Sequence, residues 1–300
     1  MARKLKRKIK RGINRTRKLI CTAAGASLFA ALYLGGGLPG LRFVQATPTE
    51  NSVDKVIDNS YENLVSSRRM TKRPFFAHRG FSSQAMENSL SAFNLAVAQG
   101  YEQLEMDLWK SSDGVIYVCH DNSLKASAGI DKKITDTDST QLDQIILKNG
   151  EKLPRLSEVF EDLQTDAIYL LELKQGSAEV PQITEILNQY KSLQRNICVQ
   201  AWDLETLKAI ENEFPYMFTM LLMPNLTLLE DALLDESLSG LAIEESQLNP
   251  EIIERIHQAD KQVWAWTVNK KGRMNELISM GVDGLISDHP DQVVEAFQGF

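Results

Sequence analysis

The stretch QLEMDLWKSSDGVIYVCHD, from Gln103 to Asp121, decides how this chain folds. Its first part alternates as a strand does, which places Glu105 and Asp107 on one face and apolar side chains on the other. The SSDG run is a turn signal, and the connection is too short for a parallel crossover, which needs about a dozen residues. We therefore expect an antiparallel hairpin whose second strand, residues 115–119, returns His120 to about the level of Glu105.

Outward from this hairpin, strand and helix patterns alternate from Pro74 onward. The expected strands are residues 75–79, 103–108, 168–173, 197–201, 218–222, 240–243, 263–268 and 284–287. The expected helices are residues 89–98, 156–163, 179–190, 204–213, 226–234, 250–259, 272–280 and 292–297. This order indicates an α/β fold, a (β/α)8 TIM barrel with an antiparallel hairpin arm after its second strand. An open doubly wound sheet is the alternative, and no glycine-rich phosphate loop follows the first strand to support a nucleotide-binding version of it.

The charge of the chain is unevenly distributed. Residues 1–49 hold eleven Lys or Arg and no acidic residue, and the rest holds 22 basic against 40 acidic residues. Nucleic acid needs a positive binding surface, so the acidic body argues against it as a partner. An acidic body suits a protein that binds divalent cations, and nothing in the sequence indicates an obligate protein partner.

The N-terminal segment is typical of a membrane anchor or a signal peptide. Ten basic residues precede an uncharged run of twenty, residues 19–38, which is long enough to span a bilayer at about 20 residues. The length of this run favours a retained anchor, whereas a Pro-Gly pair after it and a cleavage-like sequence ending at Ala46 are evidence for a signal peptide. We expect a segment over 1–46, a linker over 47–73 and a barrel domain over 74–300. We expect the barrel to be extracytoplasmic and anchored by one span, and secretion after cleavage near Ala46 is the alternative.

Several expected strands end in polar residues, where the active site of a barrel lies. Charged residues are rarely buried in strands unless they are paired or bind a metal. Glu105, Asp107 and Glu172 offer hard oxygen donors, which fit Ca²⁺ or Mg²⁺ better than zinc. Arg79 and Lys174 bring positive charge that suits a phosphate ester.

Two histidines follow strands at the same end, His78 and His120, and would suit general acid and base catalysis. Taken alone, each signal has a plain structural explanation. Glu105 and Asp107 could lie on a solvated strand face, and Glu172 with Lys174 could form a surface ion pair. Their joint placement at several strand ends favours one shared site.

These residues form a pattern that resembles the glycerophosphodiester phosphodiesterase family over residues 74–300. The matching segments are His78-Arg79-Gly80, Glu87-Asn88-Ser89, Glu105-x-Asp107, His120-Asp121-x-x-Leu124, Glu172-Leu173-Lys174, Trp266-Thr267-Val268-Asn269 and residues 281–288. The family fold is a TIM barrel. The resemblance implies metal ligands Glu105, Asp107 and Glu172, catalytic His78 and His120, phosphate contacts from Arg79 and Lys174, and Glu87 and Trp266 near the substrate. After Leu124 the chain departs from the family pattern, which bears on the substrate contacts of that loop.

The resemblance implies hydrolysis of glycerophosphodiesters to sn-glycerol 3-phosphate and an alcohol, with Ca²⁺ or Mg²⁺ as cofactor. The same chemistry on a lysophospholipid or a glycerol-phosphate polymer is one alternative. A membrane-anchored module that binds phosphodiesters without catalysis is another, and the complete set of histidines and carboxylates argues against it. Three carboxylates also argue against a metal-free phospholipase of related barrel shape.

Overall fold

The computed structural model describes residues 75–163 and 167–299 of this 300-residue chain. The expected segment 1–46 and linker 47–73 lie outside the described residues, and so does the predicted start of the barrel domain at Pro74. Within the described part, no helix is long and apolar enough to cross a membrane.

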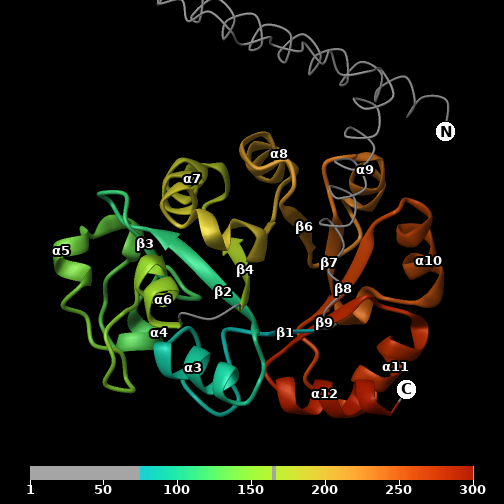
Figure 1. The fold of residues 1–300 in the computed structure, drawn as a ribbon, viewed down its shortest axis with the longest axis horizontal. Helices are drawn as coiled ribbons and strands as arrows, with labels where there is room; N and C mark the ends of the chain where they lie inside the picture. Colours follow the sequence, from blue (N-terminus) through green and yellow to red (C-terminus); the bar gives the residue numbers. More distant parts are fainter. Residues whose placement is uncertain (1–74, 164–166, 300) are drawn as a thin grey trace, which may run out of the picture. The chain divides into compact units, whose positions relative to one another are not determined.

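Eight parallel strands close into a barrel with helices around its outside (Figure 1). The strands are β1 Phe75–Ala77, β2 Gln103–Lys110, β4 Ile168–Leu173, β5 Ile197–Ala201, β6 Phe218–Met223, β7 Gly240–Glu244, β8 Gln262–Trp266 and β9 Gly284–Ser287. Strand β1 pairs with both β2 and β9, which closes the sheet. The prediction of a TIM barrel is therefore confirmed, and the open sheet is excluded.

The helices follow the predicted order. They are α3 Leu90–Ala98, α6 Leu156–Leu163, α7 Val180–Gln189, α8 Leu204–Glu213, α9 Leu229–Leu234, α10 Pro250–Gln258, α11 Lys271–Met280 and α12 Pro290–Gln298. Asp203 and Asn249 begin α8 and α10 by accepting a hydrogen bond from a backbone N–H three residues on. Helix α9 begins at Leu229, three residues later than predicted, because the Asn225 side chain accepts from the Thr227 N–H and forms a polar turn there.

The hairpin arm forms as the SSDG turn predicted. Strand β3, Ile116–Val118, pairs antiparallel with β2, with Val118 opposite Leu108. The Cys119 N–H donates to the Asp107 carbonyl at 3.0 Å, so His120 lies just past the level of Asp107. Its position is fixed further by the Trp109 indole N–H, which donates to the His120 carbonyl at 3.0 Å.

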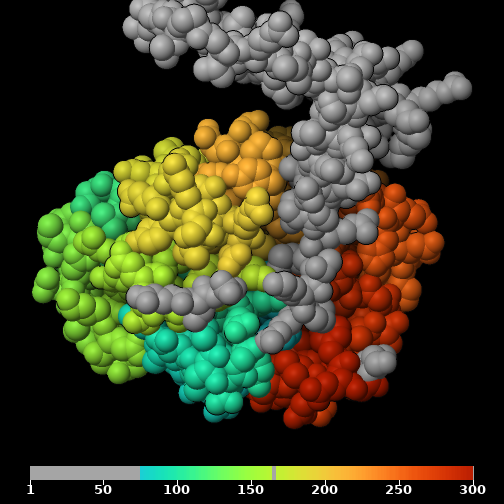
Figure 2. Space-filling view, viewed as in Figure 1, coloured from blue at the N-terminus to red at the C-terminus, as the bar shows by residue number. Residues whose placement is uncertain are grey.

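Residues 115–153, the small lobe, extend this arm beside the barrel (green in Figure 2). They include the short helices α4 Lys125–Ala128 and α5 Ser139–Leu142, which the sequence patterns did not predict. The small lobe has an apolar core of its own, made of Tyr117, Cys119, Leu124, Ile134, Leu142, Ile145, Leu147 and Leu153. Helices of four residues are too short to show a periodic pattern, which explains why they were missed.

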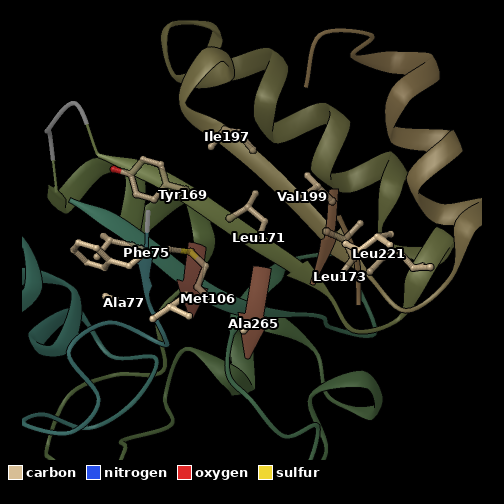
Figure 3. Packing of buried hydrophobic residues seen from close by; sticks show 14 of the residues in the cluster. Phe75, Ala77, Met106, Tyr169, Leu171, Leu173, Ile197, Val199, Leu221 and Ala265 are labelled. Carbon is tan, nitrogen blue, oxygen red and sulfur yellow. The ribbon is translucent and has the colours of Figure 1, made fainter. Parts of the chain in front are cut away.

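Alternation along the strands divides the buried side chains into two sets. One set, including Met106, Leu171 and Val199, packs between the strands and the surrounding helices (Figure 3). The other fills the barrel interior and consists of Phe76, Leu170, Cys198, Phe218, Met220, Leu222, Ala242, Trp264 and Ile286. Two residues further along the same inward rows, the apolar side chains give way to polar ones at the carboxyl ends of the strands.

Candidate active site

Three buried carboxylates meet at this end of the barrel. Glu105 and Asp107 are the inward residues of β2, and Glu172 of β4 lies opposite Asp107 in the parallel register. Their exposed fractions are 0%, 1% and 6%, and one oxygen from each lies within 4.8 Å of the others. The structure therefore brings together the three residues that the sequence predicted as metal ligands.

The electrostatics of these carboxylates are strongly perturbed. Burial, together with the charge of Asp107, raises the pKa of Glu105 to about 8. The same two causes raise the pKa of Glu172. Burial also acts to raise the pKa of Asp107, but Lys174 and Arg79 outweigh it and the net shift is downward.

Arg79 and Lys174, the two cations that the sequence predicted at this site, lie against these carboxylates. Lys174 Nζ lies 2.8 Å from Asp107 Oδ1 and 2.5 Å from Glu172 Oε1. Arg79 Nε lies 3.1 Å from Asp107 Oδ2, and its Nη1 lies 2.7 Å from Glu87 Oε2. Glu87 is therefore linked to the three carboxylates through Arg79.

The donor set fits a hard divalent cation. All three side chains offer carboxylate oxygens, the donors that Ca²⁺ and Mg²⁺ prefer. Burial and mutual repulsion disfavour the charged forms of Glu105 and Glu172, and a bound divalent cation would offset both effects. Glu105, Asp107 and Glu172 are the residues that would hold it.

His78 lies beside the carboxylates and is held from the opposite side. Its Nδ1 lies 2.6 Å from Asp288 Oδ1, and its Nε2 lies 4.0 Å from Glu105 Oε2. Burial acts to lower the pKa of His78, but the Asp288 hydrogen bond and the Glu105 charge raise it above its ordinary value. The imidazole therefore points one nitrogen at a fixed carboxylate and the other toward the centre.

His120 borders a pocket of about 160 Å³ between the small lobe and the segment before α3. Glu87 and Asn88 line the same pocket, and Asn88 Nδ2 donates to Asp107 Oδ2 at 2.7 Å, so the pocket adjoins the carboxylate centre. His120 Nδ1 lies 2.9 Å from Asp121 Oδ1, and the side chain is 35% exposed. The two predicted catalytic histidines thus lie in different surroundings, because His78 is half-buried at 14% side-chain exposure and His120 is more open, at the pocket.

Trp266, predicted near the substrate, ends β8 and donates from its indole to the Ala242 carbonyl at 2.8 Å. Its ring packs edge-to-face with Trp202, at 5.7 Å between centroids. Trp202 in turn donates to Glu172 Oε1 at 2.9 Å, so Trp266 reaches the centre through a second tryptophan. Trp202 was not predicted as a site residue from the sequence, although it continues the inward row of β5 beyond Gln200.

Asp288 is the main site residue without a predicted role. It follows β9 and accepts hydrogen bonds from Ser82 Oγ at 2.9 Å and Asn269 Nδ2 at 2.5 Å, in addition to its contact with His78. Alternation gives a signal for it, because Asp288 continues the inward row of Ile286. The sequence showed that Asp288 ends a strand, but not that it would face His78 across the chain.

Comparison with known proteins shows which protein family this chain is similar to. The model of the Glycerophosphoryl diester phosphodiesterase family matches residues 78–292. A glycerophosphodiester phosphodiesterase of Caldanaerobacter subterraneus is 28% identical over 237 residues, covering 73% of this chain and 95% of that protein. One of Bacillus subtilis is 25% identical over 268 residues, covering 79% and 90%.

Solved structures give the same picture of the fold. A phosphodiesterase of Oleispira antarctica, in complex with the product sn-glycerol-3-phosphate, superposes with a TM-score of 0.70 at 25% identity. The superposition covers 75% of this chain and 96% of that one. A glycerophosphodiester phosphodiesterase of Thermotoga maritima gives a TM-score of 0.63 at 25% identity, covering 77% and 99%.

Proposed function

The chain belongs to the glycerophosphoryl diester phosphodiesterase family and is a phosphodiesterase of glycerophosphodiesters, and on that premise we propose how it performs the reaction. It hydrolyses a glycerophosphodiester to sn-glycerol 3-phosphate and an alcohol, with Ca²⁺ or Mg²⁺ at Glu105, Asp107 and Glu172. His78 and His120 act as general acid and base. The observation that carries this proposal is the meeting of three buried carboxylates with His78 at one end of the barrel.

Arg79 and Lys174 would hold the phosphoryl group. Both cations already lie among the carboxylates, and Lys174 is partly buried, so their charge acts in a medium of low dielectric. A planar guanidinium can bind two phosphate oxygens at once, whereas an ammonium acts as a point charge. A divalent cation, when bound, would polarise the non-bridging phosphate oxygens and offset the charge that develops on them.

The two histidines would move the protons. With Nδ1 of His78 bonded to Asp288, its Nε2 remains to exchange a proton at the centre. His120 borders the pocket with Glu87 and Asn88, where the alcohol of the substrate would lie. We therefore assign the general base, which takes a proton from the attacking nucleophile, to His78 and the general acid, which protonates the leaving alkoxide, to His120.

A turnover assay of the full-length protein tests this proposal. The panel contains glycerophosphocholine, glycerophosphoethanolamine, a lysophospholipid and a glycerol-phosphate polymer, each with and without a chelator. We expect release of sn-glycerol 3-phosphate from the small diesters, loss of activity on chelation and recovery with Ca²⁺ or Mg²⁺. Full activity after exhaustive chelation would contradict the metal requirement. Turnover confined to the lysophospholipid or the polymer would contradict the proposal that small glycerophosphodiesters are the substrate.

A further inference from the structure

Gln200 extends the row of polar residues that holds the three carboxylates. It is the inward residue of β5 and lies opposite Glu172, which itself lies opposite Asp107 on β2. The three neighbouring strands therefore present Asp107, Glu172 and Gln200 at one level of the barrel. Gln200 is only 2% exposed, so its side-chain amide must find its partners inside the barrel.

Of the two polar atoms of the Gln200 amide, only the nitrogen has hydrogen-bond partners among the described residues. Its Nε2 lies 3.2 Å from Glu105 Oε1 and 3.4 Å from Glu172 Oε2, which are long hydrogen bonds. Its Oε1 is buried and has no hydrogen-bond partner among the described residues. A buried amide oxygen without a partner is destabilising, and most buried polar atoms in proteins do have one.

The two carboxylate oxygens that face Gln200 are those that the protein leaves most open. The other oxygen of Glu105, Oε2, accepts from the Arg79 N–H at 2.9 Å. The other oxygen of Glu172, Oε1, accepts from the Trp202 indole and lies against Lys174 Nζ. A cation held by these two residues would therefore bind Glu105 Oε1 and Glu172 Oε2, the pair that the end of Gln200 already touches.

The spacing at this point also suits a cation's ligands. Neighbouring ligand atoms of a six-coordinate ion lie about 3.0 Å apart for Mg²⁺ and about 3.4 Å for Ca²⁺, given bonds of about 2.1 and 2.4 Å. The end of Gln200 lies 3.2 and 3.4 Å from the two open oxygens. An amide oxygen at this point would add a fourth hard donor without adding a fourth negative charge to the three carboxylates.

We propose that Gln200 is a fourth protein ligand of the divalent cation, and that its amide turns over to bind it. Without the ion, Nε2 faces the carboxylates as a donor. With the ion, rotation about the last side-chain bond brings Oε1 to that position, and the orphaned oxygen gains a partner. This inference rests on the metal requirement of the proposed function, and it concerns only which residues complete the site.

Calorimetric titration of the full-length protein with MnCl2 tests the contribution of Gln200 directly, without an activity readout. Gln200→Met keeps the length of the side chain but offers no hard donor, and we expect its Kd for Mn²⁺ to rise by about tenfold or more. Gln200→Glu keeps an oxygen at the same point and should bind Mn²⁺ at least as tightly as the wild type. Gln103→Met is the matched control, because Gln103 is a buried glutamine at the start of β2 and donates to the Phe75 carbonyl. It should leave the Kd unchanged.

A crystal structure with Mn²⁺ separates a ligand from a mere hydrogen-bond donor. We expect the side-chain oxygen of Gln200 at about 2.0–2.4 Å from the ion. An ion more than 3 Å away, or a Gln200→Met Kd within twofold of the wild type, overturns this inference and leaves the proposed function standing. Failure of the wild-type protein to bind Mn²⁺, Mg²⁺ or Ca²⁺ would instead remove the metal requirement and this inference together.

Discussion

At the scale of single residues, the two histidines that we propose as base and acid are held differently. His78 is half-buried and fixed by Asp288, whereas His120 is more exposed and borders the pocket of the small lobe. A fixed imidazole suits a nucleophile that always arrives from the same direction. An imidazole at an open pocket can serve alcohols of different shapes.

This difference predicts how each histidine depends on the leaving group. His78→Ala and His120→Ala should each lower kcat on glycerophosphocholine by about 10²–10⁴, the usual value of a positioned proton donor or acceptor. A p-nitrophenyl phosphodiester has a leaving group that barely needs a proton, so His120→Ala should regain much of its rate there and His78→Ala should not. Equal losses on both substrates would contradict the division into acid and base. Steady-state kinetics of both variants on both substrates provide the check.

Asp288 should act on the reaction through His78. Asp288→Asn keeps the shape of the side chain but cannot hold a protonated imidazole as a carboxylate does, so we expect kcat to fall at least about tenfold with KM little changed. The matched control is Asp283→Asn, because Asp283 also contacts a histidine, His257, at 2.8 Å but on the outside of the barrel. Equal losses in both variants would mean that Asp288 acts through stability alone.

The same pair predicts a pH dependence of stability. Burial acts to raise the pKa of Asp288, but the hydrogen bond and charge of His78 lower it to about 2 from an ordinary 3.8. The pKa of His78 is raised above its ordinary 6.5. The lowered pKa of Asp288 therefore stabilises the fold above pH 3.8, and this stabilisation is lost as the pH falls toward 2. The raised pKa of His78 stabilises the fold below pH 6.5, and this stabilisation is lost as the pH rises through that raised pKa.

Urea unfolding of the wild type and Asp288→Asn over a pH series measures this effect. The difference in free energy of unfolding should be largest between these two ordinary values and should shrink on either side. A difference that stays constant from acid to alkaline pH would show that the pair does not ionise as described.

At the scale of strands and helices, the alternation of side chains explains both what the sequence predicted and what it missed. The carboxylates were predicted because two of them stand two residues apart in one apolar strand. Gln200, Trp202 and Asp288 lie on the same inward rows, but a glutamine, a tryptophan and an aspartate at a strand end have many ordinary roles. Their importance depends on contacts across strands, which one sequence does not reveal.

The barrel interior sets a strict limit on the size of one strand residue. A methyl group added to Gly284 of β9 would come within 2.3 Å of the ring of Trp264 on β8. Trp264 is fully buried among the interior side chains and cannot move aside. We expect Gly284→Ala to lower the free energy of unfolding by about 1–3 kcal/mol, as overpacking usually does.

Chemical denaturation of Gly284→Ala and of a second glycine variant gives the measurement. Gly272 lies near the start of α11, and nothing lies within 4 Å of an added methyl group there. Gly272→Ala should be neutral or stabilise the protein by up to about 1 kcal/mol, because alanine favours helix. If Gly284→Ala proves equally neutral, the packing around Trp264 must be looser than described.

At the scale of the whole molecule, the basic and apolar start of the chain contrasts with its acidic body. We propose that residues 1–46 place the barrel outside the cytoplasm, since the basic residues precede the uncharged run and such charges stay on the cytoplasmic side.

Protease treatment of intact cells tests this topology. An anchored external domain should be digested and leave a short protected fragment, and a secreted domain should be found in the medium. A domain that stays protected until the cells are lysed would contradict both forms of the proposal. A cytoplasmic protein followed in the same samples verifies that the cells remain intact.

Because of the small lobe, the pocket for the alcohol and the groups that act on the phosphate lie on different parts of the chain, and evolution can change one without the other. The small lobe lines the pocket beside His120, whereas the carboxylates lie on β2 and β4 and His78 follows β1. Because the small lobe packs around an apolar core of its own, substitutions or insertions within residues 122–153 can reshape the pocket without moving the phosphate chemistry. Descendants of such a chain could drift from one alcohol to another while keeping the same reaction, and an engineer could follow the same route by exchanging this segment.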